Sequence, residues 1–130
     1  MEILSFNTTE EEQAVDITPV LRKIVEKSKV VEGTLLVYCP HTTAAVVVNE
    51  GTDETFVADL FLALEKFASG KWSHQSNPKA HLKAAMIGNS KLLPISQGKL
   101  FLGAWESVFL LEFDGPRERK IFARAARQEV

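Results

Sequence analysis

The chain has 130 residues, of which 45% are hydrophobic and 25% charged, so it can bury one core but is too short for two ordinary domains. Its formal net charge of −2 argues against a general nucleic-acid-binding protein, which normally carries a strongly basic domain. Its apolar runs are far shorter than the ~20 residues of a membrane-spanning helix, and no basic segment followed by an apolar one opens the chain. We therefore expect a single domain over residues 1–130, located in the cytoplasm.

The first half of the chain is predicted to alternate strands and helices. Residues 2–7 alternate apolar and polar side chains, as a half-buried strand does. A helix is expected over residues 18–28, with Thr as its N-cap and Pro at its first position. Residues 33–39 and 44–49 are apolar and β-branched enough to be buried strands, and a second helix, capped by Thr52, runs to residue 67. Its predicted core stripe consists of Phe56, Val57, Leu60, Phe61 and Leu64.

The second half of the chain is predicted to contain one helix and several strands joined by tight turns. Asn77 and Pro78 repeat the signal of a cap followed by proline, and Gly88 can end the helix that they open. Four strands are expected over residues 91–95, 99–102, 107–113 and 118–126. The pattern predicts an α+β domain in which about three helices pack on antiparallel or mixed, sandwich-like sheets.

His41 is the first candidate for chemistry, because it lies where one predicted buried strand ends and the next begins. The other two histidines, His74 and His81, lie in a polar segment that leads into the third helix. A catalytic zinc ion typically takes three protein ligands and keeps a fourth position for water or substrate. The three imidazoles meet that count, although Pro78 makes one continuous helix through His74 and His81 unfavourable. The residues alone leave two outcomes open: a shared metal site, or separate surface and core histidines.

Asn49, Glu50 and Asp53 form a second candidate group, where a buried strand is followed by a capped helix. One interpretation is structural, since a carboxylate at a helix N-terminus stabilises the helix. The other is functional: helical spacing places Asp53 on the packed side, where it would orient a metal-bound histidine or act as general base. On the residues alone both interpretations stay open.

Arg117 and Arg119 form a third candidate group, together with Trp105 and Glu106. The two arginines are two residues apart in a predicted strand, so their guanidinium groups are expected on one face. Such a pair suits bidentate phosphate binding, and Trp105 would stack on a flat ring. The alternative is a tight hairpin with exposed ion pairs, which contribute only ~0–1 kcal/mol each.

These motifs, in this order, resemble the YjbQ-like proteins, also called the secondary thiamine-phosphate synthase family. The resemblance covers nearly the whole chain. The matching parts are residues 40–45, 49–50, Asp53, Asp59, the segment from His74 to His81 with Asn77, residues 80–84, Gly88, Pro94, and residues 98–100, 103–106 and 113–119.

The resemblance implies a YjbQ-like α+β fold that assembles as a homotrimer, with a polar pocket near a subunit interface. It implies that His41, His74 and His81 bind a divalent metal ion; zinc or another transition metal suits three imidazoles, whereas Mg²⁺ is the usual partner of a diphosphate. The implied activity is that of a transferase, which joins a pyrimidine methyl diphosphate to a thiazole phosphate and releases pyrophosphate. The expected substrate contacts are Thr42, Thr43, Asn49, Trp105, Glu106, Arg117 and Arg119.

The chain departs from the family pattern at Ala104 and Glu106, where Thr and Gln are usual, and at Lys79, where an acidic residue is usual. These departures affect the expected substrate more than the fold. Two alternatives therefore stand beside the synthase. One is a metal-assisted hydrolase of a phosphorylated or amide-bearing metabolite, with Asp53 or Glu50 as base. The other is a non-catalytic trimer that binds a metal or an anion.

Overall fold

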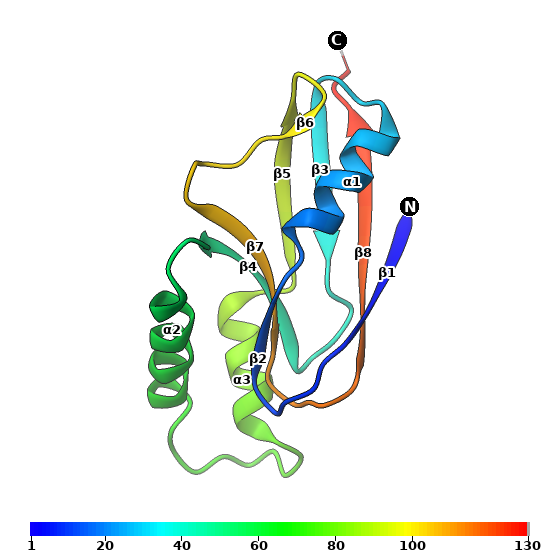
Figure 1. Cartoon of the computed structure of the whole chain (residues 1–130). Coiled ribbons are helices and arrows are strands. Elements are labelled where there is room, and N and C mark those ends of the chain that lie inside the picture. The colour runs from blue at the N-terminus through cyan, green and yellow to red at the C-terminus, as the bar shows by residue number, and fades with distance from the viewer. Residues whose placement is uncertain (130) are drawn as a thin grey trace.

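Antiparallel strands form two sheets in the computed structural model of the chain, which describes residues 1–129 (Figure 1). One sheet has the strand order β1-β8-β3-β5-β6, and the other has the order β2-β7-β4. The first consists of β1 (Glu2–Asn7), β8 (Glu118–Arg127), β3 (Gly33–Tyr38), β5 (Ser90–Ser96) and β6 (Lys99–Leu100). The second consists of β2 (Gln13–Asp16), β7 (Glu106–Glu112) and β4 (Ala44–Glu50). The predicted antiparallel pairing is confirmed.

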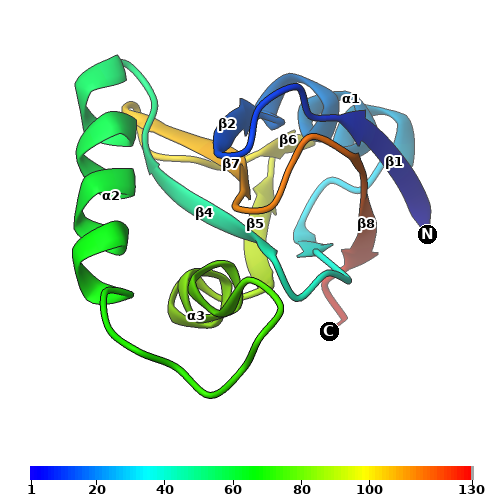
Figure 2. The same ribbon diagram turned by 90° about the horizontal axis from the view of Figure 1, so that it is seen from below.

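Three helices complete the described part of the chain: α1 (Thr18–Ser28), α2 (Glu54–Phe67) and α3 (Pro78–Ile87). α1 packs against the five-stranded sheet, whereas α3 lies along β4 of the three-stranded sheet with α2 beside it (Figure 2). Among the described residues, none of the helices is both long and apolar enough to cross a membrane. The expected α+β fold with three helices is confirmed.

At the N-termini of α1 and α2, the capping residue is not the one that was predicted. Asp53, and not Thr52, caps α2, because its carboxylate accepts a hydrogen bond from the backbone N–H of Thr55 at 2.9 Å. Thr18 is the first residue of α1 and not its cap, and its N–H donates to the carboxylate of Asp16 at 2.9 Å. Asp53 thus takes the role predicted for Thr52, whereas the cap position of α1 is Ile17, whose side chain makes no capping hydrogen bond.

The bounds of α3 agree with the prediction, whereas one predicted strand is shorter than expected and one strand was not predicted. The side chain of Asn77 accepts the N–H of Ala80 at 3.3 Å, and Gly88 follows the last helical residue. The strand expected over residues 99–102 is limited to Lys99–Leu100. β2, four residues long, was not predicted, because a short stretch beside three glutamates carries little apolar periodicity.

The core has two parts. The larger one lies between α1 and the two sheets, and the smaller one lies between α2, α3 and the three-stranded sheet. The larger part includes the fully buried residues Ile17, Leu21, Val25, Leu35, Val37, Leu110 and Ile121. The smaller part consists of Ala45, Leu64, Ala80, Ala84, Phe109, Leu111 and Phe113. Each fully buried Val or Leu side chain stabilises the fold by ~1.5–3 kcal/mol relative to an exposed one, so both parts hold the helices in place.

α2 is covered on one side only. Of its predicted core stripe, Leu64 is buried, whereas Phe56, Val57, Leu60 and Phe61 are only half-buried. The prediction that the stripe is core is therefore right for Leu64 and right in part for Val57, Leu60 and Phe61, which pack against the smaller core part while partly exposed. Two further apolar side chains of α2, Leu62 and Phe67, are 64% and 48% exposed.

A buried ion pair joins the two sheets. Arg119 of β8 is 2% exposed and Glu112 of β7 is fully buried. The Arg119 Nε donates to both carboxylate oxygens of Glu112 at 2.9 Å, and its Nη2 donates to Thr43 Oγ1 at 2.7 Å. Burial alone would raise the pKa of Glu112, but hydrogen bonds from Arg119, Thr8 and the Asp114 N–H outweigh burial and hold this pKa below its usual range. Both charges are therefore present and compensated inside the protein.

We expect Arg119→Leu to lower the free energy of unfolding by about 3–5 kcal/mol, because it leaves the Glu112 carboxylate buried without its partner. Arg119→Lys keeps the charge and loses the bidentate contact, so its free energy of unfolding is expected to lie between those of Arg119→Leu and the wild type. Arg117→Leu is the control, since Arg117 is exposed, and should cost about 1 kcal/mol or less. Urea denaturation measures all three. Equal values for Arg119→Leu and Arg117→Leu would contradict a structural role of the buried pair.

Candidate functional site

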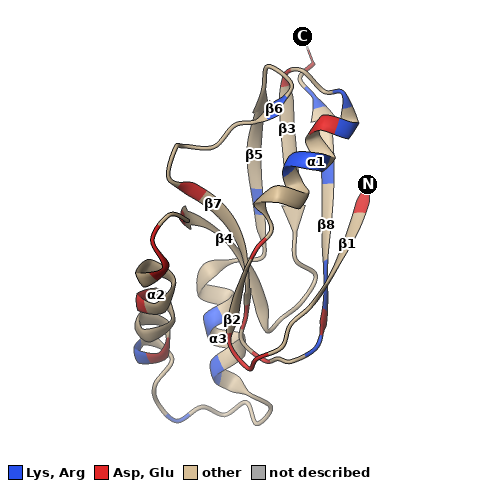
Figure 3. Ribbon diagram, viewed as in Figure 1, with Lys and Arg blue, Asp and Glu red and all other residues tan. Residues whose placement is uncertain are grey.

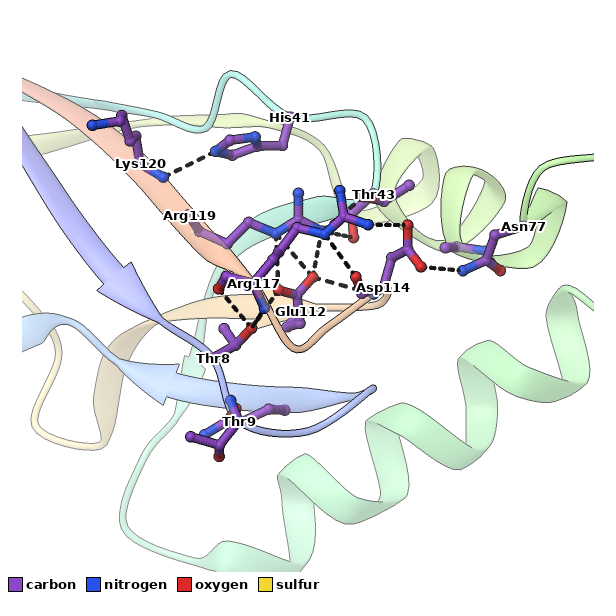
Figure 4. A network of polar contacts seen from close by, with 12 residues as sticks. Thr8, Thr9, His41, Thr43, Asn77, Glu112, Asp114, Arg117, Arg119 and Lys120 are labelled. Carbon is purple, nitrogen blue, oxygen red and sulfur yellow. Dashed lines mark hydrogen bonds and ion pairs between the residues drawn. The ribbon is translucent and has the colours of Figure 1, made fainter.

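His41 lies in the loop between β3 and β4, and its ring is fixed by the neighbouring sheet. Its Nε2 accepts a hydrogen bond from the backbone N–H of Lys120 in β8 at 2.9 Å (Figure 4). Burial, followed by the charge of Arg119, holds the pKa of His41 below its usual range. A neutral imidazole that accepts at Nε2 carries its proton on Nδ1. His41 is therefore a neutral hydrogen-bond donor near pH 7.

His41 and His81 line one cavity, although they are 40 positions apart in the chain. The cavity has a volume of about 440 Å³ and is lined by His41, Thr42, Ala44, His81, Ala84, Ala85, Gly88 and Asn89. Among these described residues there is no carboxylate. Ala44, Ala84 and Ala85 contribute small apolar side chains to this lining, and its polar groups belong to His41, Thr42, His81 and Asn89.

The turn between α3 and β5 is attached to both sides of the His41 loop. The carbonyl of Asn89 accepts the N–H of Cys39 at 2.7 Å, and the carbonyl of Gly88 accepts the N–H of Val46 at 3.2 Å. Gly88 has a φ of 97°, a conformation that favours glycine. These bonds fix the position of the end of α3 relative to His41.

The other end of α3 is attached to the turn that follows β7. Asn77, which caps α3, donates from its amide to Asp114 at 2.9 Å, and Asp114 also pairs with Arg117 at 2.9 Å (Figure 4). His81 lies one helical turn after this attachment. Its position therefore depends on the connection between β7 and β8, which contains Asp114 and Arg117.

His74 lies on the other side of His81, in the segment that precedes α3. The two imidazole rings meet edge to face, with their centroids 4.7 Å apart and an interplanar angle of 84°. A second cavity of about 360 Å³ is lined by Trp72, Ser73, His74, Pro78, His81 and Leu82. His81 is therefore a wall of both cavities.

The structure places the three histidines in two pairs that share His81: His41 lines a cavity with it, and His74 contacts its ring. Among residues 1–129, no group of three histidine, cysteine, aspartate or glutamate side chains is arranged to hold a metal ion. The Nε2 lone pair of His41 is used by the Lys120 N–H, and its Nδ1 carries the proton, so neither nitrogen is free to bind a metal in this arrangement. In this arrangement His74 and His81 are the imidazoles in direct contact, and the three-histidine metal site stays a prediction.

Glu50 and Asp53, which the sequence suggested as catalytic, lie at the opposite end of β4 from His41. The length of β4 separates the two places by roughly 20 Å, at ~3.3 Å per residue. Glu50 accepts the N–H of Thr52 at 2.6 Å, and Asp53 accepts the N–H of Thr55 at 2.9 Å. The hydrogen bond from the Thr52 hydroxyl, followed by that from its N–H, holds the pKa of Glu50 below its usual range, and the N–H and hydroxyl of Thr55 do the same for Asp53. Asp53 is exposed, so its expected position on the packed side is wrong.

Trp105, Glu106 and Asn49 lie near Glu50 and are therefore also far from His41. The carbonyl of Trp105 accepts the N–H of Gly51 at 2.9 Å, and Glu106 is paired with Glu50 in the β4 and β7 register. The Trp105 side chain is 71% exposed. Within one chain, this group of residues does not reach the cavity of His41 and His81.

The two arginines do not share a face. β8 begins at Glu118, so Arg117 lies before the strand, where it is exposed and paired with Asp114. Arg119 points into the protein and holds Glu112 and Thr43 (Figure 4). The expectation of an arginine pair open to a phosphate is therefore wrong. Of the two threonines, Thr42 lines the cavity, whereas Thr43 is buried.

The sequence analysis missed Trp72 and Asn89. Trp72 lies two residues before His74 in a segment without regular structure, so no periodic pattern marked it. Asn89 follows the glycine that ends α3, and its proximity to His41 depends on pairing between distant strands. An aromatic residue close to a histidine was the one local signal available.

Comparisons with known proteins find relatives along almost the whole chain. The model of the family described as "UPF0047 protein YjbQ-like" matches residues 2–128. A UPF0047 protein of Archaeoglobus fulgidus is 41% identical over 127 residues, which cover 94% of this chain and 98% of that protein. The UPF0047 protein YugU of Bacillus subtilis is 30% identical, over 95% and 97% of the two chains.

Solved structures agree with the fold. An uncharacterised protein of the YjbQ/UPF0047 family from Clostridium acetobutylicum has a TM-score of 0.92 at 38% identity, with coverage of 97% of this chain and 100% of that one. A protein of unknown function from Sulfolobus solfataricus, described as YbjQ-like, has a TM-score of 0.93 at 34% identity, with coverage of 98% and 96%.

We expect His41→Ala to keep the zinc content of the wild type after incubation with Zn²⁺ and desalting, because the Nε2 of His41 is engaged by Lys120. His74→Ala and His81→Ala are expected to lower that content together, since their rings are in contact. Elemental analysis by mass spectrometry measures the bound zinc. An equal loss in all three variants would contradict this division and support the three-histidine set; a wild type that retains no zinc would exclude the pair.

Proposed function

The chain belongs to the UPF0047 family of YjbQ-like proteins, and on that basis we propose that it is an enzyme acting on a small phosphorylated or heterocyclic molecule at His41 and His81. One observation carries the proposal: two histidines from distant segments line a cavity of about 440 Å³. Ligand sites in proteins typically measure ~300–1,000 Å³ and contain a few convergent polar groups. His41, held neutral by its surroundings, is one such group. The proposal assumes the cytoplasm as its location.

The reaction that we propose to test first is thiamine-phosphate synthesis, as a secondary activity. In it, the bond between the pyrimidine methylene carbon and the diphosphate oxygen breaks, and its electron pair leaves with pyrophosphate. The ring nitrogen of the thiazole phosphate forms the new bond to that carbon and becomes cationic. The transfer itself requires no proton donor, so the main task of the protein is to stabilise the charge of the departing pyrophosphate.

Donors on the rim of the cavity are suited to that task. The Nδ1–H of His41, the hydroxyl of Thr42 and the amide of Asn89 belong to residues that line the same cavity. Fixed hydrogen-bond donors stabilise developing negative charge strongly when water is partly excluded. Thr42 thereby keeps its predicted place among the substrate contacts, whereas Arg119 supports the loop from beneath.

A divalent metal ion remains part of the proposal only as an addition to these donors. When bound, such an ion would neutralise the charge of a diphosphate. Mg²⁺ prefers oxygen ligands and imidazoles prefer zinc-like ions, and His41 is already engaged by Lys120. The steps above therefore depend on the side chains and not on a metal.

We also propose that the chain assembles as a homotrimer, and its exposed apolar side chains support association. Leu36 of β3 lies opposite Leu92 of β5 on the outer face of the five-stranded sheet, where Leu92 is 65% exposed. Tyr38 and Phe122 lie on the same sheet with ring centroids 6.3 Å apart. Contiguous apolar surface of this kind marks protein–protein contacts in soluble proteins.

We expect the purified wild type to form thiamine phosphate from the two precursors, and His41→Ala to lower kcat/KM by about 10²–10³-fold, the typical effect of removing one donor to a developing anion. Glu26→Ala, at an exposed position of α1, is the matched control and should retain wild-type activity. Product is measured by chromatography, with pyrophosphate release in parallel.

Three outcomes separate the synthase from its alternatives. Pyrophosphate release without thiamine phosphate would replace the synthase by a hydrolase. Binding of the precursors without turnover would favour a non-catalytic binding protein. Equal activity of the wild type and His41→Ala would contradict the proposed site.

We expect light scattering of the purified protein at micromolar concentration to give three times the mass of the 14.4 kDa chain. Leu36→Lys with Leu92→Lys should shift the mass toward one chain, because the two side chains are neighbours on the exposed sheet face. Lys23→Glu, at an exposed position of α1, is the control and should leave the mass unchanged. A wild type with the mass of one chain would contradict the trimer.

A further inference from the structure

The cavity on the Trp72 side of His81 has aromatic and apolar walls. Besides the two histidines, its lining includes Trp72, Pro78 and Leu82. The indole N–H of Trp72 donates to the carbonyl of Ala68 at 2.9 Å, so the one polar group of this side chain already has a partner. A β-carbon on Gly70 would lie 3.0 Å from the indole ring, so the glycine leaves room for it. Trp72 is thus held in place by one edge and is still 45% exposed.

A fixed and exposed indole is suited to stack on a flat ring. Aromatic pairs prefer offset-stacked or edge-to-face geometry and gain stability beyond the area that they bury. The edge-to-face contact between His74 and His81 closes the neighbouring wall with two more rings. This cavity therefore favours the ring of a ligand.

The cavity on the His41 side favours an anion. Its described lining has no carboxylate and includes His41, whose proton is on Nδ1 because its Nε2 accepts the Lys120 N–H. The cavity is lined by α3, the start of β4 and the turn before β5. The lysines of α3 are paired with carboxylates, whereas the one charged residue of β5 is basic (Figure 3).

Lys91 provides a cation beside this cavity. Its Nζ lies 3.6 Å from the place that a β-carbon on Gly88 would take, and Gly88 lines the cavity. The ammonium donates to the Ile87 carbonyl at 3.2 Å and makes no ion pair with any residue from 1 to 129. Burial lowers the pKa of Lys91. A partly buried ammonium without a carboxylate partner is stabilised by any anion that comes within hydrogen-bond distance.

We propose that the two cavities form one bipartite site for a ligand in which a flat ring is joined to a phosphate. The ring lies against Trp72, the phosphate lies beside His41 and Lys91, and His81 stands between the two parts as their common wall. The inference rests on the proposed function in one respect, that the substrate occupies the His41 cavity, and it adds the residues that bind the ring and the phosphate of that substrate. It also moves ring stacking from Trp105 to Trp72 and phosphate binding from the arginines to Lys91.

Calorimetric titration of the full chain with phenyl phosphate, inorganic phosphate and phenol tests the proposal. Phenyl phosphate is expected to bind at least about tenfold more tightly than either fragment, because it fills both parts at once. Trp72→Leu should weaken phenyl phosphate about tenfold and leave inorganic phosphate unchanged. Lys91→Met should weaken both phosphates and leave phenol unchanged.

Trp105→Leu is the matched control, since it removes the other tryptophan, which lies at the far end of β4, and it should not change any of the three affinities. Trp72→Phe keeps a ring and should keep most of the affinity, which separates stacking from a failure to fold. Equal effects of Trp72→Leu and Trp105→Leu, equal binding of phenyl phosphate and inorganic phosphate, or no binding of phenyl phosphate would each overturn the bipartite site.

The titrations also separate this inference from the proposed activity. The expected binding pattern without formation of thiamine phosphate would retain the bipartite site and reject the synthase. Turnover of the two precursors that is unaffected by Trp72→Leu and Lys91→Met would retain the synthase and reject the bipartite site.

Discussion

The buried pair of Arg119 and Glu112 is the contact on which the rest of the structure depends. Burying two charges costs several kcal/mol per ion unless hydrogen bonds replace the lost hydration. Here every buried side-chain nitrogen and oxygen among the described residues has a partner. The partners of the pair come from separate parts of the chain, Thr8 after β1 and Thr43 before β4. The compensation thus requires the two sheets and both loops to be in place together.

This contact also determines where His41 lies. Thr43, two residues after His41, is held by the guanidinium of Arg119, and Lys120, the next residue of β8, donates its N–H to the imidazole. The loop is thereby fixed from two adjacent positions of one strand. The same positive charge, together with burial, keeps the imidazole neutral. A structural ion pair and a candidate functional group are therefore parts of one network.

The fold was predictable where the chain contains strong local signals, and the candidate site was predictable only in part. Asn77, Pro78 and Gly88 define α3 because each has a conformational reason to lie where it does. Asp53 was predicted to lie on the packed side of α2. This was wrong because helical spacing does not apply to a residue that caps the helix and lies outside it. The family resemblance named residues at both ends of β4, and nothing local in the sequence shows that the length of a strand separates Glu50 from His41.

The arginines and Trp72 are two further cases in which local sequence patterns did not predict where a side chain lies. The alternation rule applies inside a strand, and β8 begins between Arg117 and Arg119, so one arginine became buried and the other exposed. Trp72 has no periodic neighbours, and its importance comes from packing beside His81, which only the folded chain brings about. Charge compensation and cavity walls depend on residues far apart in sequence, and single-sequence patterns do not record such contacts.

The surrounding network fixes His41 as a neutral donor whose proton is on Nδ1. Nitrogen-15 NMR of the His41 ring across a pH titration measures both the tautomer and the pKa. The account predicts the Nδ1–H tautomer at pH 7 and a pKa below the usual value of about 6.5, so that the ring stays neutral while free histidine becomes protonated. An Nε2–H tautomer, or a ring that is protonated at or above that usual pKa, would contradict it.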